Sequence, residues 1–339
     1  MLRKGLARCG RNSIASCAFG RSLSTTARSA STGAPVPIAT VDAFATDYYS
    51  GNPAAVCLLP SNAKPLHGPD AREFDDWMRS VAEEMKLSET AFLRPMKGDN
   101  NNFELRWWTP TVEVDLCGHA TMASSHALLS VFGAATPTQD ITFHTLSGEL
   151  LARRLNEDEI EMDFPEEGSH GKVDLDHEHI ALVAQGLGIE QHQIVAAERN
   201  RMDLLVELDS EATLSSIPWY PDFGVLAQTE NRVLIVTAKS EDSDGDFDIA
   251  TRFFAPAFGV NEDPVCGSAH CFLGPYWTPR FGRPTLNSRA ACERGGAARV
   301  GVGKAGGASQ DGRVKLVGRT VTTLSGNLVG GLPDHLFQS

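Results

Sequence analysis

The chain has 339 residues, of which 42% are apolar and 22% are charged, and its formal net charge is −13. This length and composition are typical of a globular protein with a sizeable core, and they favour two domains. The negative charge argues against nucleic-acid binding, which needs basic patches, and no apolar run reaches the length of a membrane-spanning helix.

The first 41 residues differ in charge from the rest of the chain. They contain five arginines and one lysine but no acidic residue, and the first carboxylate is that of Asp42. Serine, alanine and threonine are frequent in this segment, as in mitochondrial transit peptides. We therefore expect residues 1–35 to be a mitochondrial-type transit peptide, which would direct the protein to the mitochondrial matrix. The alternative is a disordered basic leader on a cytoplasmic protein.

The segment after the leader mixes strand-like and helix-like patterns. Apolar residues at helical spacing predict an amphipathic helix over residues 70–86, and a second helix is expected at residues 118–132. Alternating or continuous apolar runs predict strands at residues 38–44, 54–59, 89–93, 102–109, 141–146, 149–155 and 159–164.

The second half has the same character. An acidic connection at residues 165–179 leads to an expected helix at residues 180–187, and the glycine-rich residues 301–312 predict a loop. Strands are expected at residues 194–197, 201–208, 232–237, 248–254 and 314–324. Strands with interspersed helices indicate an α/β or α+β protein.

A repeat links the two halves. Residues 106–120 and 252–269 both contain an arginine, two aromatic residues, a proline, a valine, an acid and a cysteine-glycine pair, in this order. Aligned on their arginines, the copies match Val114 with Val260, and a three-residue insertion containing Pro264 then displaces the second cysteine. The repeat predicts two related halves.

Each copy ends where a helix is expected to begin. Gly118 follows Cys117 in the first copy, and Gly267 follows Cys266 in the second. A helix start offers unpaired backbone N–H groups and the positive end of a dipole, which suit a carboxylate or other anion. We therefore expect both helix starts to face one bound small molecule.

Three further side chains could carry chemistry. Glu89 begins an apolar strand, where partial burial would raise its pKa towards the range useful for acid/base catalysis; otherwise it is a solvated strand end. His119 at a helix start is expected to be neutral and able to relay protons, or else to pack against its own loop. Asp263 precedes Pro264 and could serve as a helix cap, a catalytic group or both.

The seven cysteines are scattered through the chain. They show neither metal-ligand spacing nor a disulfide framework, so we expect no metal site and a reducing compartment.

Several motifs together resemble the PhzF family of phenazine biosynthesis-like isomerases. They comprise residues 41–44 with 51–56, residues 88–92, residues 117–121, residues 261–265 with 267–270, and residues 294–296. The similarity extends over about residues 38–327, and the principal motifs occur in the family's order.

This resemblance implies an α+β fold of the diaminopimelate-epimerase type. Two pseudo-symmetric lobes would each wrap a curved sheet around a central helix, with the active site between them. We expect residues 36–165 and 322–339 in the N-terminal lobe and residues 166–321 in the C-terminal lobe. The resemblance also implies a homodimer that uses neither an organic cofactor nor a metal.

The resemblance implies a role for individual residues. Glu89 would move a proton between atoms of a small carboxylate-bearing substrate, and His119 and Asp263 would orient or relay protons. Ser268 and the backbone N–H groups near Gly118 and Gly267 would hold the substrate carboxylate.

Two alternatives remain open from the sequence. Cys117 and Cys266 occupy matching places in the two halves and could form the base pair of an amino-acid or hydroxy-acid racemase or epimerase, or could be small buried residues. A binding or scaffold protein that keeps the fold without turnover is the other alternative.

Overall fold

The computed structural model describes residues 35–98, 101–303 and 312–338. Residues 1–34 of the predicted transit peptide lie outside the described ranges, as do residues 304–311 of the predicted glycine-rich loop. No helix within the described ranges combines the length and apolar character needed to cross a membrane.

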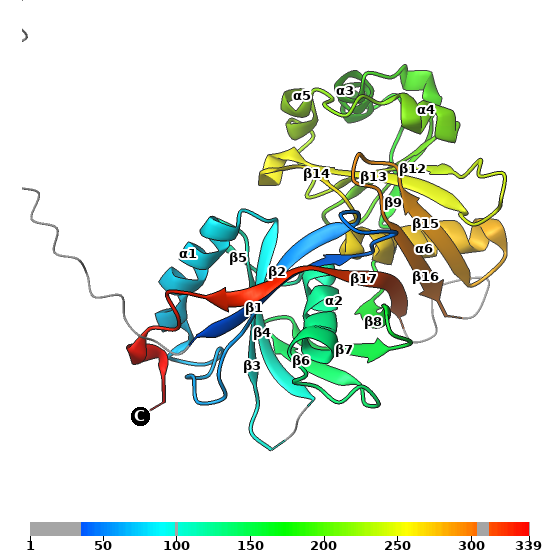
Figure 1. The fold of residues 1–339 in the computed structure, drawn as a ribbon. Helices are drawn as coiled ribbons and strands as arrows, with labels where there is room; N and C mark the ends of the chain where they lie inside the picture. Colours follow the sequence, from blue (N-terminus) through cyan, green and yellow to red (C-terminus); the bar gives the residue numbers. More distant parts are fainter. Residues whose placement is uncertain (1–34, 99–100, 304–311, 339) are drawn as a thin grey trace, which may run out of the picture.

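The described chain forms two lobes, each with a sheet around a central helix, α2 in the first and α6 in the second (Figure 1). The helices are α1 (Asp75–Met85), α2 (Gly118–His126), α3 (Glu178–Leu187), α4 (Glu211–Ser216), α5 (Phe223–Ala227) and α6 (Gly267–Phe281). The strands are β1 (Val36–Ala43), β2 (Asn52–Leu58), β3 (Glu89–Pro95), β4 (Asn102–Trp108), β5 (Glu113–Val114), β6 (Ile141–Thr145), β7 (Gly148–Arg154), β8 (Glu159–Pro165), β9 (Gly171–Lys172), β10 (Ile194–Arg199), β11 (Leu204–Leu208), β12 (Leu234–Lys239), β13 (Ile249–Ala255), β14 (Val260–Asp263), β15 (Thr285–Ala290), β16 (Ala297–Val302) and β17 (Arg313–Leu328).

Helix α2 is the centre of the first lobe. All nine of its residues are buried, and it contacts β1, β2, β3, β8 and β17. Its residues are small or uncharged, as expected for a helix that is covered on all sides. It continues into a π-helical turn at Ala127–Val131, so the predicted helix at residues 118–132 is present with a change of geometry.

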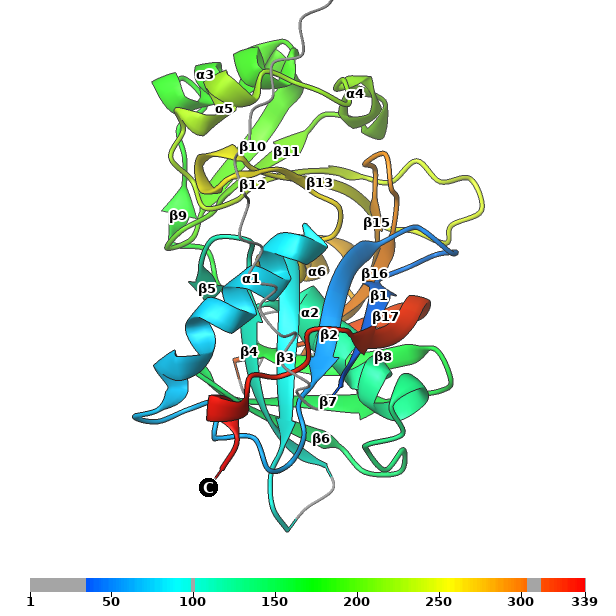
Figure 2. The ribbon, with the colours of Figure 1, turned by 60° about the vertical axis from the view of Figure 1, so that its left-hand side comes forward.

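The central strands β11, β12 and β13 of the second lobe bury both of their faces. Leu204, Val206 and Leu208 of β11 join one apolar cluster with α3, α4 and α5, whereas Leu205 joins a second cluster with α6. Successive side chains of a strand point to opposite faces, which explains this division. Figure 2 accordingly shows α3, α4 and α5 on the opposite side of this sheet from α6.

In the first lobe, α1 has the corresponding outer position. Met78 and Ala82 are its buried residues and belong to a cluster with strand residues on the face away from α2. This helix was predicted from its apolar spacing at residues 70–86, and its first part is instead a short 3-10 helix at Ala71–Phe74.

The last strand joins the two lobes. Residues Arg313–Arg319 of β17 pair with β8, part of this segment also pairs with β16, and Thr320–Leu328 pair with β1. The sheets of the two lobes are therefore hydrogen-bonded into one network. The predicted lobe boundary at residue 321 falls within this strand, and the division of the chain at that residue stays a prediction.

Candidate active site

The two central helices begin side by side. Helix α2 starts directly after Cys117, and α6 starts directly after Cys266. A Cβ atom on Gly118 would lie 3.3 Å from the Cα atom of Gly267, and the reverse distance is the same, so the backbones are in contact. Neither preceding cysteine side chain caps its helix. The first-turn N–H groups and the positive ends of two helix dipoles therefore adjoin, which suits a bound anion.

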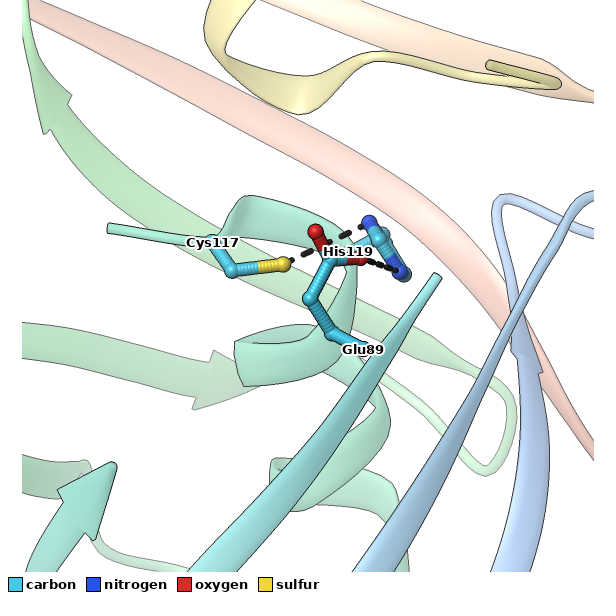
Figure 3. Close-up of side chains that lie close together, drawn as sticks. All are labelled: Glu89, Cys117 and His119. Atoms are coloured by element: carbon cyan, nitrogen blue, oxygen red, sulfur yellow. Dashed lines mark hydrogen bonds and ion pairs between the residues drawn. The ribbon is translucent and has the colours of Figure 1, made fainter. Parts of the chain in front are cut away.

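Glu89, Cys117 and His119 lie together at the start of α2 (Figure 3). The Nε2 atom of His119 is 3.2 Å from Oε2 of Glu89 and 3.2 Å from Oγ of Ser88, and its Nδ1 atom is 3.5 Å from Sγ of Cys117. The side chains of His119 and Glu89 are only 6% and 16% exposed. Glu89 is the first residue of β3, so the start of this strand positions its side chain.

One oxygen of Glu89 is open to a new hydrogen bond. Its Oε2 atom is buried and has no hydrogen-bond partner among the described residues, so the 3.2 Å approach of His119 is a contact without hydrogen-bond alignment. A buried carboxylate oxygen without a partner is costly, and a proton or a donor group would relieve that cost.

Asp263 reaches this group from the second lobe. Its Oδ1 atom accepts a hydrogen bond of 2.5 Å from Nδ2 of Asn52, which also donates to the Val265 carbonyl at 3.1 Å. Burial raises the pKa of Asp263, and the nearby charge of Glu89 adds to this shift, while His119 acts in the opposite direction. The two carboxylates therefore share one electrostatic environment, although they come from different lobes.

Both cysteines of the repeat are buried thiols. Burial raises the pKa of Cys117, and the charge of Glu89 raises it further. Burial also raises the pKa of Cys266, with a further contribution from the charge of Asp263. A raised pKa keeps both side chains protonated, whereas the thiolate is the reactive and metal-binding form.

Ser268 lies at the edge of this group. Its Oγ atom is 3.4 Å from Sγ of Cys266 and accepts a hydrogen bond of 3.2 Å from Nη1 of Arg232. Arg232 in turn forms a two-point ion pair with Asp203, with Nε–Oδ1 and Nη2–Oδ2 distances of 2.8 and 2.5 Å. Thus every side chain predicted for the site lies at the two helix starts, and Ser268 joins the others through Cys266.

Sequence reasoning did not assign roles to Asn52 or Arg232. Asn52 belongs to a motif that was noted in the sequence, and its position at the start of β2 between a turn and an apolar run was the available signal. Arg232 gave no local signal, because its partner Ser268 is 36 residues away in the chain.

The structure corrects the alignment of the repeat after the prolines. Arg106 pairs with Glu113, and Arg252 pairs with Glu262, each through two hydrogen bonds of 2.6–2.9 Å. In the strand pairing, Trp107 of β4 opposes Val114 of β5, and Phe253 of β13 opposes Asp263 of β14. Asp263 therefore corresponds to Val114, not to Asp115, and the matching of Val114 with Val260 was wrong. The insertion precedes Glu262, so the acid at this position is present in one half only.

The cluster has a set of atoms that could also be ligands of a metal. Glu89, Cys117 and His119 each offer one such atom, and these atoms lie within 4.8 Å of one another. Burial and the charge of Glu89 raise the pKa of the Cys117 thiol, so a metal bound there would have to displace the thiol proton.

Comparison with known proteins gives consistent results. The sequence profile of the phenazine biosynthesis-like protein family, PhzC-PhzF, matches residues 41–326. A protein named as an uncharacterized isomerase from Halalkalibacterium halodurans is 43% identical over 293 residues, which cover 86% of this chain and 98% of the relative.

Solved structures support the fold. A PhzC/PhzF protein from Clostridium difficile, described as a phenazine biosynthesis protein, is 33% identical and has a TM-score of 0.71, with coverage of 86% of this chain and 99% of that one. A hydroxyproline epimerase from Agrobacterium vitis is only 13% identical, with a TM-score of 0.54 over 89% of this chain and 97% of that one. The two-lobed epimerase-type α+β fold predicted from the sequence is confirmed.

Proposed function

This chain belongs to the PhzC-PhzF family of phenazine biosynthesis-like proteins, and from this membership we propose that it is an isomerase that moves a proton within a small carboxylate-bearing metabolite. The observation that supports this proposal most is the position of Glu89. Its unpartnered Oε2 atom lies beside His119, next to two adjoining helix starts. An anion held at those helix starts would place its neighbouring carbon atoms close to a carboxylate base.

The proposed reaction conserves the atoms of the substrate. Glu89 takes a proton from one substrate atom, while the electron pair shifts within the substrate, and the same carboxyl group returns the proton to another atom. His119 and Asp263 orient the substrate or relay protons. The N–H groups near Gly118 and Gly267, with the Ser268 hydroxyl, hold the substrate carboxylate. Because these steps are proton transfers, we propose that the reaction is cofactor-independent.

The proposal is tested with a metabolite screen followed by one substitution. Carboxylate metabolites are screened by thermal shift, and those that stabilise the protein are incubated in deuterium oxide and followed by NMR for isomerisation and deuterium uptake. The change Glu89→Gln keeps the shape of the side chain but removes its titrating group. We expect it to lower turnover by at least about 100-fold, the usual minimum effect of a general acid or base.

A matched control separates chemistry from folding. Glu84 is an exposed residue of α1, so Glu84→Gln is expected to keep both turnover and thermal stability. Full turnover in the Glu89→Gln protein would exclude Glu89 as the acid/base group.

A second candidate function is a racemase or epimerase that uses two thiols. The observation in its favour is that Cys117 and Cys266 directly precede two helices whose starts are in contact. The raised pKa of each thiol weighs against it, because a two-base mechanism needs one thiolate. Each single change to alanine should stop the reaction if this mechanism operates, and full turnover by the double alanine variant would eliminate it.

A third candidate is a protein that binds a carboxylate without converting it. Thermal stabilisation by a metabolite that shows no isomerisation and no deuterium uptake would favour this candidate over the isomerase.

The proposal also covers the oligomeric state of the protein and its location in the cell. We place the protein in the mitochondrial matrix as a homodimer, with a cytoplasmic location as the alternative. Light scattering on the purified protein tests the dimer, and fluorescent fusions with and without residues 1–35 test the location.

A further inference from the structure

Arg232 fixes the hydrogen-bonding role of Ser268. The guanidinium group carries only donors, so the Ser268 oxygen must accept the 3.2 Å hydrogen bond from Nη1 of Arg232. A hydroxyl group that accepts one hydrogen bond keeps its own hydrogen for another partner. Ser268 therefore remains a donor on the side that faces away from Arg232.

The neighbour that could take this hydrogen is a weak acceptor. Sγ of Cys266 lies 3.4 Å from the Ser268 oxygen. Burial raises the pKa of this thiol, so the sulfur carries no negative charge that would compete for the hydroxyl hydrogen. A carboxylate oxygen at the start of α6 would be a much stronger acceptor.

Arg232 is itself held in place. Its ion pair with Asp203 uses both Nε and Nη2, and the Asp203 side chain is fully buried. Asp203 also accepts a hydrogen bond of 3.2 Å from Nδ2 of Asn200. Burial would lower the pKa of Arg232, but the hydrogen bonds and the charge of Asp203 outweigh this effect. The guanidinium is thus a fixed, permanently charged donor.

We propose that Arg232 is a positioning residue that makes the Ser268 hydroxyl a hydrogen-bond donor to the anionic group of the substrate, and so favours a carboxylate over its uncharged amide. The inference rests on the proposed carboxylate site at the helix starts. It adds Arg232, which lies outside both copies of the repeat, to that site.

The test uses binding instead of turnover. Benzoate is the carboxylate probe and benzamide is its uncharged counterpart, and dissociation constants are measured by NMR titration of the full chain. Removing Arg232 alone would leave Asp203 buried without its partner, which is strongly destabilising. The variant is therefore Arg232→Gln combined with Asp203→Asn, which removes both charges together.

A double-mutant cycle separates positioning from general structure. We expect Ser268→Ala to weaken benzoate binding about 10-fold, the usual effect of losing a hydrogen bond to a charged group. The Arg232/Asp203 variant should weaken benzoate binding about 3- to 10-fold and benzamide binding by a smaller factor, because the amide carbonyl is an uncharged and weaker acceptor. Added to Ser268→Ala, it should have no further effect, because the hydroxyl through which Arg232 acts is gone.

The control is Arg299→Gln. Arg299 is on β16, its side chain is 43% exposed, and its ion-pair contact is with Glu159 at 3.7 Å, so binding of both probes should be unchanged. Equal losses for benzoate and benzamide, additive losses in the Ser268→Ala protein, or no benzoate binding by the unaltered chain would each overturn the inference. Retained turnover in Glu89→Gln would instead remove the proposed acid/base role and leave a positive binding cycle intact.

Discussion

The carboxyl group of Asp263 combines a short hydrogen bond with an environment that disfavours its charge. Asn52 donates to it across the contact between the lobes, while burial and the charge of Glu89 raise its pKa. Because the matching position in the first half is Val114, this cost is present only once in the pair of repeats. Such costs are common where function requires a charged or titrating group.

This raised pKa gives a pH-dependent prediction for Asp263→Asn. An acid whose pKa is higher in the folded than in the unfolded state contributes most below its unfolded pKa, near 3.8, and loses that contribution as pH rises through the folded pKa. We therefore expect Asp263→Asn to be more stable than the parent at pH 7, with a difference that shrinks towards pH 4. Urea unfolding at the two pH values measures it.

The control is Asp115→Asn. Asp115 is exposed, so this change should shift the free energy of unfolding by no more than about 0.5 kcal/mol. An Asp263→Asn protein that is less stable than the parent at pH 7 would contradict the expected direction.

At the scale of elements, the contact between α2 and α6 depends on the absence of two side chains. The arginine-glutamate pairs of the repeats hold the loops before the helices, and the glycines then let the helix starts touch. The two halves thus meet through backbone, and the distance between their N–H groups is fixed by packing.

We predict that Gly267→Ala is destabilising. Its Cβ would lie 3.3 Å from the Cα of Gly118, and backbone cannot rotate away as a side chain would. Overpacking of this kind costs about 1–3 kcal/mol, and it would also separate the helix starts and weaken carboxylate binding. Thermal unfolding and the benzoate titration measure the two effects.

Gly326→Ala is the matched control, since a Cβ on Gly326 meets no atom within 4 Å. Equal stability of the Gly267→Ala protein and the parent would show that the helix starts are not packed as described.

Elements with clear periodicity could be predicted from the sequence, and others could not. The helix α1 and the strands β1–β4 and β6–β8 followed their apolar patterns. Strands β15 and β16 were missed because polar or small residues such as those of Thr285–Ala290 interrupt the pattern. Helices α4 and α5 have only six and five residues, although Ser210 and Asp222 cap them through their side chains and were usable signals.

Residues of the candidate site could be proposed from the sequence only where they stand in local motifs. Glu89, His119 and the residues at the helix starts stand in short recognisable segments. The register of Asp263 was misjudged because Val260 imitates Val114 at the same distance from the arginine, and only strand pairing resolves this. Asn52 and Arg232 contact residues that are far away in the sequence, so no short motif spacing could have predicted these contacts.

At the scale of the whole molecule, β17 holds both lobes in one hydrogen-bonded network. Its first part pairs with β16 and β8, and its second part pairs with β1. Neither lobe can complete its sheet without this strand.

We accordingly predict that a chain ending at residue 312 does not fold. It would leave β1, β8 and β16 each with one neighbouring strand fewer, and it would remove buried residues such as Val314 and Leu316 from the apolar cluster around α2. Loss of dispersed amide signals in an NMR spectrum would show this. A chain that starts at residue 35 keeps β1 and β17, so it should give a dispersed spectrum; a dispersed spectrum from the truncated chain would refute the prediction.

The pairing of β1 with β17 has a consequence for synthesis on the ribosome. Val36 pairs with Leu328, so β1 gains this neighbour only after residue 328 has been translated and has left the ribosome. Such long-range pairing slows folding and leaves strand edges open to aggregation or to chaperones. Glu89 and Asp263 likewise lie far apart in the sequence, so a nascent chain shorter than 263 residues cannot bring these two carboxylates together.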